Sequence, residues 1–242
     1  AGPTIITAPF LLEELFDLHN KNIKKYVELK SLDNWYRFVF NDGSIFDYES
    51  SLEKTIANIR KIDAIDAANY HKFLQASKRI YEVAFTKLAD RPFNNFYFML
   101  KQLPTLIKFR ADLSVFDFVS KYFKNDKLKR AFSIQPLLVG GNPFSTTCIY
   151  ALIHYLERKH GVFFSMGGTG SLVKALGKLI EEVGIKVYLN KTIDHINLKE
   201  NRISNIVDNH GNQHSADIYV SNIDPMYLYN NLIKKKNVSK VI

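Results

Sequence analysis

Histidine, serine and cysteine are the side chains here that could bind a metal or act as nucleophiles, and their spacing supports neither role. The seven histidines are scattered singly, and only His210 and His214 lie close together, on either side of a predicted hairpin turn. No predicted helix carries the paired histidines or carboxylates of a zinc site, so the sequence predicts no metal. Ser165 and Ser171 adjoin glycines without Gly-x-Ser-x-Gly spacing, and Cys148 falls within a predicted helix, where a core role is favoured. The catalytic residues stay unknown.

A glycine loop is the next candidate for chemistry. Gly167-Gly168-Thr169-Gly170 follows a predicted strand and precedes a predicted helix, where a phosphate cradle would lie. Counted from Gly168, however, Val173 takes the place of the third glycine of a dinucleotide fingerprint. The acidic residue expected about twenty residues later is also missing. We therefore expect turn geometry, or close approach of the backbone to a flat or bulky group, rather than a complete nucleotide site.

The stretch from Arg91 to Arg130 combines aromatic and basic residues. Nine Lys or Arg and three Asp give it six of the nine net positive charges of the chain. Short helices of this composition are typical of an interfacial membrane anchor, in which apolar faces enter the bilayer and lysines reach anionic headgroups. Ordinary amphipathic helices with solvated lysines are the alternative. Single-stranded nucleic acid also suits such surfaces, but no recognition fold is visible, so we expect no nucleic acid partner.

Composition sets the class of protein that could carry these features. The 242 residues are 46% hydrophobic and 13% aromatic, which is enough to fill the core of one large or two modest domains. The excess of basic residues suits an anionic partner such as a membrane surface. Cys148 is the only cysteine, which excludes an intramolecular disulfide and favours a reducing compartment. No apolar run reaches the length of a membrane span.

The first two thirds of the sequence predict a hairpin followed by helices. Strands at 35–40 and 44–48 flank an Asn-Asp-Gly turn at 41–43. Helical patterns then run from Leu52 to about Arg130, the longest over 67–90. A turn at 140–143 precedes a helix that Ser145 or Thr146 would cap and Gly161 would close.

The pattern of predicted elements changes in the last third of the sequence. A strand at 162–164 leads into the glycine loop and a helix that ends at Gly184. Short strands are predicted at 185–189, 192–198, 202–207 and 214–220, with a turn at 209–212. A final helix begins at Asp224-Pro225. This order predicts a mixed α/β (α+β) fold with part of an antiparallel sheet, and boundaries near residues 31 and 165.

Several long motifs resemble the bacterial-type phytoene desaturases. The similar segments are Ala1-Gly2-Pro3-Thr4, Gln135 to His154, Leu156-Glu157-Arg158, Gly161-Val162, Gly167 to Gly170, Leu189-Asn190 with Ile193, and Ser221-Asn222-Ile223-Asp224. The resemblance extends along essentially the whole chain. It implies an FAD-linked, amine-oxidase-like flavoprotein whose amino-terminal Rossmann strand and glycine loop precede residue 1 and whose carboxy-terminal flavin segment follows residue 242.

The resemblance also implies a division of labour along the chain. Residues 1–30 would lie next to the flavin. Residues 31–165, a hairpin plus helices, would bind substrate and associate with the membrane. Residues 166–242 would return to the FAD-binding domain. The chain as given would then lack the part that holds the phosphates of FAD, and we expect it to be inactive alone.

The implied activity is removal of hydrogens from phytoene towards lycopene in carotenoid biosynthesis. The hydride equivalent would pass to FAD, and quinone or oxygen would take the electrons onward. Because phytoene dissolves in the bilayer, a peripheral, monotopic position on the cytoplasmic side of a membrane is expected. This agrees with the aromatic and basic residues between Arg91 and Arg130.

Motif by motif, the resemblance assigns site residues. Gly2, Pro3 and Thr4 would lie near the flavin ring, and Ile193 would offer its backbone to the adenine. The substrate cavity would be lined or shaped by Asn142, Pro143, Phe144, Tyr150, Gly167 and Gly168. One departure matters: relatives often have an Asp, sometimes suspected as an acid, where this chain has Phe98. No residue is therefore identified as an acid or base.

Two alternatives stay open. A related desaturase, saturase or isomerase could use another isoprenoid, such as a C30 carotenoid precursor. A non-catalytic module that binds lipid or membrane is the alternative from another class, and it predicts a parent gene without flanking flavin motifs. The sequence leaves undetermined the number of desaturation steps, the electron acceptor and the oligomeric state.

Overall fold

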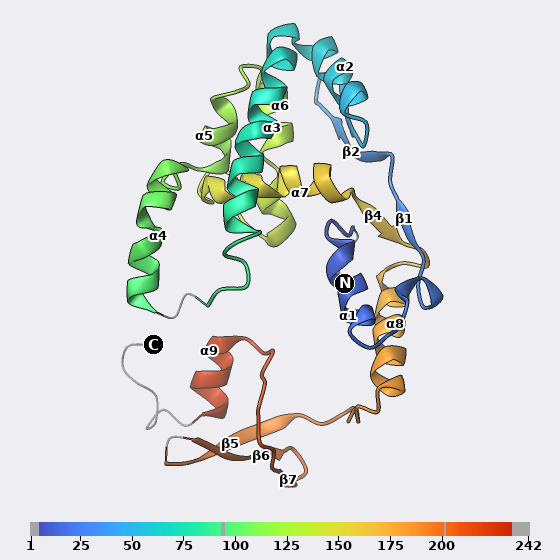
Figure 1. The fold of residues 1–242 in the computed structure, drawn as a ribbon, viewed down its shortest axis with the longest axis vertical. Helices are drawn as coiled ribbons and strands as arrows, with labels where there is room; N and C mark the ends of the chain where they lie inside the picture. The colour runs from blue at the N-terminus through green and yellow to red at the C-terminus, as the bar shows by residue number, and fades with distance from the viewer. Residues whose placement is uncertain (1–4, 93–94, 201, 234–242) are drawn as a thin grey trace. The chain divides into compact units, whose positions relative to one another are not determined.

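The computed structural model describes residues 5–92, 95–200 and 202–233. The chain forms two compact units, Ala1–Val183 (unit 1) and Gly184–Ile242 (unit 2), and each is described by itself. Helices dominate unit 1, whereas unit 2 contains a three-stranded antiparallel sheet (Figure 1), which confirms the mixed α/β class. The predicted domain limits at residues 31 and 165 both fall inside unit 1 and stay a prediction.

Unit 1 contains two small antiparallel sheets surrounded by helices. Its elements are α1 Pro9–Asp17, η1 Ile23–Lys25, β1 Leu29–Ser31, β2 Asn34–Val39, β3 Ile45–Glu49, α2 Leu52–Ile62, α3 Ala64–Ala84, α4 Phe96–Lys108, α5 Val115–Ser120, α6 Asp126–Phe132, η2 Gln135–Val139, η3 Cys148–Ala151, α7 Leu152–His160, β4 Phe163–Ser165 and α8 Thr169–Glu182. Unit 2 contains β5 Ile193–Lys199, β6 Arg202–Asp208, β7 Gln213–His214, α9 Pro225–Tyr227 and the π-helical turn η4 Leu228–Leu232.

The predicted hairpin is confirmed as β2 and β3. Arg37 pairs with Asp47 and Phe38 with Phe46 across the two strands. Gly43 in the connecting turn has a φ of 78°, a conformation that glycine adopts without a steric penalty. The alternation of the strands places Phe46 and Tyr48 in the core, and it leaves the Arg37–Asp47 ion pair on the outside.

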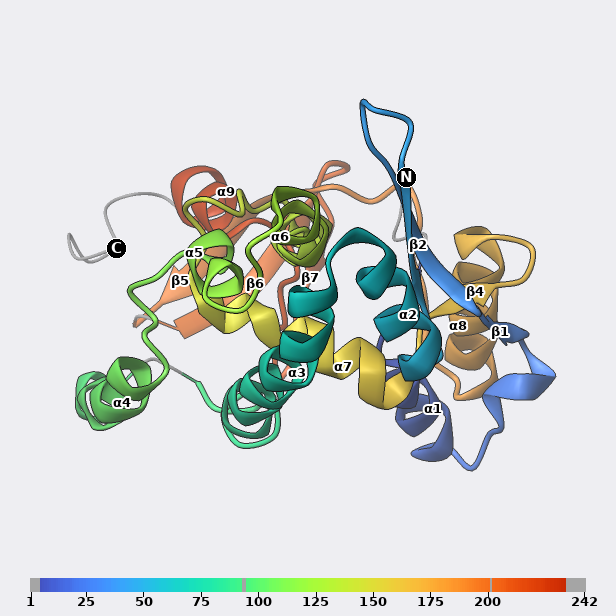
Figure 2. The same cartoon turned by 90° about the horizontal axis from the view of Figure 1, so that it is seen from above.

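Helix α3 is the central element of unit 1, and α7 packs against it, as Figure 2 shows from above. Asp63 caps α3 by accepting the backbone N–H groups of Ile65 and Asp66 at 2.8 and 3.0 Å. The buried Asp66 carboxylate in turn accepts the N–H groups of Lys124 and Asn125, each at 2.9 Å. Hydrogen bonds to a charged acceptor contribute about 1.5–3 kcal/mol each, so the first turn of α3 holds the connection between α5 and α6.

A second, smaller core joins the beginning and the end of unit 1. Strand β1 pairs with β4, with Leu29 opposite Ser165. Phe16 and Ile23 near the start of the unit pack against Ala175 and Leu179 of α8. Chain segments about 150 residues apart in sequence therefore share one hydrophobic cluster.

Several predicted boundaries are wrong. Thr147 caps the segment leading to α7, in place of Ser145 or Thr146, and the longest helix spans Ala64–Ala84 rather than 67–90. Residues 185–189 form no strand, and the strand predicted at 214–220 is reduced to Gln213–His214. Residues 185–189 and 215–220 have strand-forming composition but pair with no other strand among the described residues, and an extended segment without a ladder partner is not stabilised.

Candidate functional site

The glycine loop forms a tight connection between β4 and α8. Gly167 and Gly168 have φ values of 81° and 80°, and the ψ of Gly168 is 178°. Ser171 fixes the loop. Its hydroxyl oxygen lies 2.7 Å from the carbonyl oxygens of both Met166 and Gly168, to which it can donate, and 2.8 Å from Ser165 Oγ. The conformation of Gly168 is one that only glycine adopts readily. The backbone conformation of the loop is therefore enough to explain why residues 167 and 168 are glycines.

Two glycine-to-alanine substitutions in this region should change the free energy of unfolding in opposite directions. A Cβ at either Gly168 or Gly177 would meet no atom within 4 Å, but only Gly168 has a positive φ. We expect Gly168→Ala to lower the free energy of unfolding by about 1–3 kcal/mol through backbone strain. Gly177→Ala, inside α8, should raise it by about 0.4–1 kcal/mol because alanine restricts the unfolded chain. Urea unfolding of both variants checks this, and a loss of stability in both would contradict it.

The turn from Asn142 to Phe144 also has a local explanation. The Asn142 side chain accepts the N–H of Phe144 at 2.9 Å, and the carbonyl of Pro143 accepts the N–H of Phe116 at 3.1 Å. The Phe144 ring is 65% exposed and contacts the ring of Phe116, with 4.7 Å between centroids. Asn142 is therefore engaged in an Asx turn, and Phe144 is left with a free apolar face.

Tyr150 lies in an apolar groove between the end of α3, helix α4 and η3. The groove has a volume of about 380 Å³. We call it the α3–α4 groove; its lining residues are Val83, Ala84, Leu88, Ala89, Arg91, Gln102, Thr105, Leu106, Phe109, Ile149, Tyr150 and Leu152. Arg91, Gln102 and Thr105 are its few polar side chains, so the groove suits an apolar ligand.

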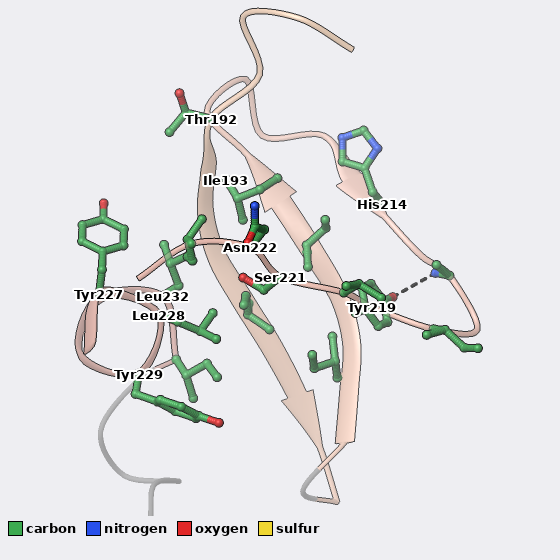
Figure 3. A pocket seen from close by; sticks show the side chains of 18 of the residues that line it. Thr192, Ile193, His214, Tyr219, Ser221, Asn222, Tyr227, Leu228, Tyr229 and Leu232 are labelled. Atoms are coloured by element: carbon green, nitrogen blue, oxygen red, sulfur yellow. Dashed lines mark hydrogen bonds between the residues drawn. The ribbon is translucent and has the colours of Figure 1, made fainter. Parts of the chain in front are cut away.

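Unit 2 has a larger pocket that includes Ile193 (Figure 3). It measures about 930 Å³ and lies on one face of β5 and β6, bordered by the segment that carries Tyr219, Ser221 and Asn222 and by the final helix. Isoleucines from both strands supply part of its apolar wall, and further apolar side chains come from the segment 216–223 and the final helix; the tyrosines, Ser221 and Asn222 supply polar atoms. Such a lining can hold a flat, partly polar ring system.

Near this pocket, Asp208 organises the hairpin turn that carries His210 and His214. The carboxylate of Asp208 is buried and accepts hydrogen bonds from Lys191 Nζ at 2.9 Å and from the N–H groups of His210 and Asn212, each also at 2.9 Å. His214 Nε2 lies 3.1 Å from the same carboxylate. These donors, Lys191 first, hold the pKa of Asp208 well below its ordinary value. The cluster stabilises a turn.

The residues predicted for the site occupy separate places in the structure. Asn142, Pro143 and Phe144 form one turn, and Tyr150 lies in the α3–α4 groove. Gly167 and Gly168 line neither this groove nor the pocket at Ile193. Gly2, Pro3 and Thr4 lie outside the described residues. Their functional assignments therefore stay predictions.

Sequence reasoning missed a buried polar network on α7. His154 is fully buried, with Nδ1 3.1 Å from the Tyr48 hydroxyl and Nε2 3.0 Å from the Tyr70 hydroxyl. One turn further along, Glu157 Oε1 accepts a hydrogen bond from the hydroxyl of Tyr36 at 2.7 Å, while Glu157 Oε2 has no hydrogen-bond partner among the residues that the structure describes. The three-residue spacing of His154 and Glu157, which places them on one face of a helix, was the signal in the sequence that could have indicated this network. Their burial, however, depends on elements that are distant in the sequence.

Burial shifts the proton affinities of this network in opposite directions. Removal from water raises the pKa of Glu157 from its ordinary 4.5 to about 7, although the Tyr36 hydrogen bond opposes the shift. Burial, followed by the charge of Arg158, holds the pKa of His154 well below its ordinary 6.5. Both groups are therefore neutral in the folded protein at mildly acidic pH.

Replacing one member should expose the pH dependence of the other. Folded Glu157 holds a proton more tightly than unfolded Glu157, so its contribution to stability is lost as pH rises from 4.5 through about 7. Folded His154 resists protonation, so its contribution is lost as pH falls below about 6.5. Between these limits the two slopes, up to about 1.4 kcal/mol per pH unit each, oppose one another.

We therefore expect the stability of Glu157→Gln to fall, relative to wild type, as pH decreases from 6.5 to 5. His154→Asn should show the opposite slope. Urea unfolding of the three proteins at pH 5, 6 and 7 measures the slopes. Parallel pH profiles for wild type and Glu157→Gln would refute the assignment.

The aromatic and basic stretch from Arg91 to Arg130 divides into two parts. Phe118 and Phe123, on and just after α5, belong to the core of unit 1. Helix α4 is different, because none of its residues is buried. Its large exposed side chains are Phe96, Tyr97, Met99, Leu100, Leu103, Leu106 and Ile107. No helix in the described part of the chain is long and apolar enough to span a bilayer.

Cys148 is the one thiol in the sequence, and its environment makes it unreactive. The side chain is buried and its Sγ donates towards the carbonyl oxygens of Phe109 and Arg110 at 3.3 and 3.1 Å. Burial raises the pKa of the thiol to about 11. Since the thiolate is the nucleophilic form, Cys148 acts as a packing residue.

Known proteins similar to this chain share one enzyme family. The family model of flavin containing amine oxidoreductases matches residues 1–237. The lycopene-forming phytoene desaturase of Pantoea ananas is 38% identical over 97% of this chain and 48% of that protein, and the one of Pseudescherichia vulneris is 37% identical over 96% and 47%. The neurosporene-forming phytoene desaturase of Cereibacter sphaeroides is 32% identical over 96% and 45%. The chain thus spans about half the length of these relatives, and it belongs to the family of flavin containing amine oxidoreductases.

Proposed function

We propose that this chain is part of an FAD-dependent desaturase that removes hydrogens from phytoene on the way to lycopene. The observation that carries the proposal is the 38% identity, over 97% of the chain, with a lycopene-forming phytoene desaturase. A neurosporene-forming relative at 32% identity means that the proposal covers the reaction type and leaves the number of steps open.

The apolar lining of the α3–α4 groove supports a hydrocarbon substrate. A C40 hydrocarbon offers no hydrogen-bonding group, so a protein must hold it by shape and by excluding water. Tyr150, Leu106 and Phe109 present such surfaces in the groove. By resemblance, we propose that Asn142, Pro143, Phe144, Gly167 and Gly168 shape other parts of the substrate cavity.

The pocket around Ile193 supports a place for the adenine of FAD. Its volume of about 930 Å³ accommodates an adenine ring, its isoleucines offer flat apolar contact, and Ser221 and Asn222 offer polar atoms. When bound, the flavin would supply the redox chemistry by accepting the hydride equivalent, with quinone or oxygen as the next acceptor. We propose that Gly2, Pro3 and Thr4 lie near the flavin ring and that a glycine loop outside these 242 residues holds the phosphates.

Product analysis tests the function and separates it from its rivals. We expect the full-length, FAD-loaded enzyme to convert phytoene into products with longer conjugation, detected by their absorption spectra after chromatography. Conversion of a C30 precursor with phytoene left untouched would favour the related desaturase, saturase or isomerase. No conversion of either, together with a parent gene that lacks flavin motifs, would favour a non-catalytic lipid-binding module.

We also propose that α4 attaches the protein peripherally, as a monotopic protein, to the cytoplasmic side of a membrane. Phe96 and Ile107 are 68% and 71% exposed, and Lys101 and Lys108 lie on the same helix. An apolar helix face flanked by lysines is typical of interfacial binding, in which each buried large side chain contributes about 1.5–3 kcal/mol. The rest of the basic stretch would add attraction to anionic lipids.

Two matched double variants distinguish membrane binding by α4 from non-specific adsorption of exposed apolar side chains. We expect Phe96→Ser with Ile107→Ser to weaken sedimentation with anionic liposomes at least tenfold, because two anchoring side chains are lost. Val39→Ser with Ile45→Ser is the matched control, since these residues are 68% and 53% exposed on the hairpin of the same unit. Equal loss in both double variants, or no loss in the first, would contradict the proposal.

A further inference from the structure

One end of the pocket at Ile193 is polar, and a single buried carboxylate holds the side chains there. Lys191 Nζ lies 2.9 Å and His214 Nε2 lies 3.1 Å from the same oxygen of Asp208, Oδ2, so the two nitrogens lie side by side. Both side chains line the pocket. Ile193 and His214 lie towards this end, and Tyr229 lies towards the other (Figure 3). The polar end of the pocket is therefore the one next to Ile193.

Asp208 determines which nitrogen of His214 can accept a hydrogen bond. Its carboxylate also accepts the backbone N–H groups of His210 and Asn212, each at 2.9 Å. Such donors, the Lys191 ammonium first, hold the pKa of Asp208 well below its ordinary value, so the group is an anion that can only accept hydrogen bonds. His214 Nε2 must then carry the hydrogen of this contact. In the neutral imidazole, this leaves Nδ1 as an acceptor.

The backbone next to Ile193 is fixed by the same hairpin turn. The N–H of Asn209 donates to the carbonyl of Thr192 at 2.8 Å, and the Asn209 side chain accepts the N–H of Thr192 at 3.3 Å. Ile193 follows directly and pairs with Asp208 across the sheet. The turn therefore fixes the start of β5 relative to Asp208 and to the side chains that this carboxylate holds.

We infer that Lys191 and His214 select adenine over other purine bases at this end of the pocket, and that Asp208 is the residue that positions them. This inference rests on the proposed function and deepens it, because it names the groups that distinguish the base of the cofactor. Adenine has a ring nitrogen that accepts a hydrogen bond next to an amino group that donates one. Lys191 supplies the donor for the ring nitrogen, and His214 Nδ1 supplies the acceptor for the amino group.

Hypoxanthine and guanine do not match this pair of groups. Both have a carbonyl oxygen where adenine has the amino group, so His214 Nδ1 would face a second acceptor. A ligand that leaves a polar group of its pocket unpaired loses affinity. The isoleucines of the pocket would contact all three bases in the same way, because apolar contact is not directional. Discrimination between the bases therefore depends on the polar end of the pocket.

Nucleotide binding to the full-length apoprotein, with its flavin removed, tests the inference. ADP and IDP are the probes, since they differ only at the amino group of the base and the adjoining ring nitrogen. By isothermal titration calorimetry, we expect wild type to bind ADP about tenfold more tightly than IDP. His214→Phe and Asp208→Asn should abolish this preference, and Lys191→Met should weaken ADP binding about tenfold. Lys199→Met and His210→Phe are the matched controls, because both residues are exposed on the same sheet or turn and do not line the pocket.

The ratio of the two dissociation constants separates recognition of the base from stability of the turn. A variant that only loosens the fold weakens ADP and IDP alike and leaves the ratio unchanged. An unchanged ratio in His214→Phe would therefore overturn the inference while leaving the proposed function intact, and so would a wild type that binds the two nucleotides equally. A full-length protein that binds neither FAD nor ADP would instead refute the proposed function.

Discussion

The Arg158 guanidinium is the interaction on which the helical part of unit 1 depends. Its nitrogens donate to the carbonyls of Glu49 and Ser50 at 2.7 and 3.0 Å, to Thr55 Oγ1 at 2.7 Å and to the Tyr70 hydroxyl at 3.0 Å. A largely buried charge is tolerated only when its donors are satisfied, so these partners have to keep their positions. One side chain thereby fixes the hairpin, α2, α3 and α7 relative to one another.

This constraint extends to the α3–α4 groove. Helix α7 continues directly from η3, so the chain that carries Arg158 and His154 on the core side also carries Tyr150 towards the groove. The aromatic rings around Arg158, with Trp35 and Tyr48 at 4.6 and 4.4 Å from the guanidinium carbon, make that core stiff. A rigid wall suits a ligand that is recognised by shape alone, because shape selection fails if the wall yields.

The sequence predicts those features whose cause is local. Gly43, Gly161 and Asp224 mark turns and caps correctly, since backbone conformation and short-range hydrogen bonds decide them. The network of His154 and Glu157 was not predictable, because its partners lie on β2, β3 and α3, up to 121 residues away. The strand expected at 185–189 and most of the strand expected at 214–220 do not form for the same reason: pairing is a property of two segments, and composition describes only one.

The region between Arg91 and Arg130 shows why composition alone could not locate an interaction surface. Phe118 and Phe96 belong to the same aromatic and basic stretch, yet Phe118 is 6% exposed and Phe96 is 68% exposed. Both rings belong to short helices that are rich in aromatic residues; what differs is whether a neighbouring element covers the ring. The exposed apolar side chains of α4, such as Phe96 and Ile107, form a surface that the described residues of unit 1 do not cover. Transfer of such a surface out of water is favourable, and this is the free energy on which the proposed attachment of α4 to a membrane would rest.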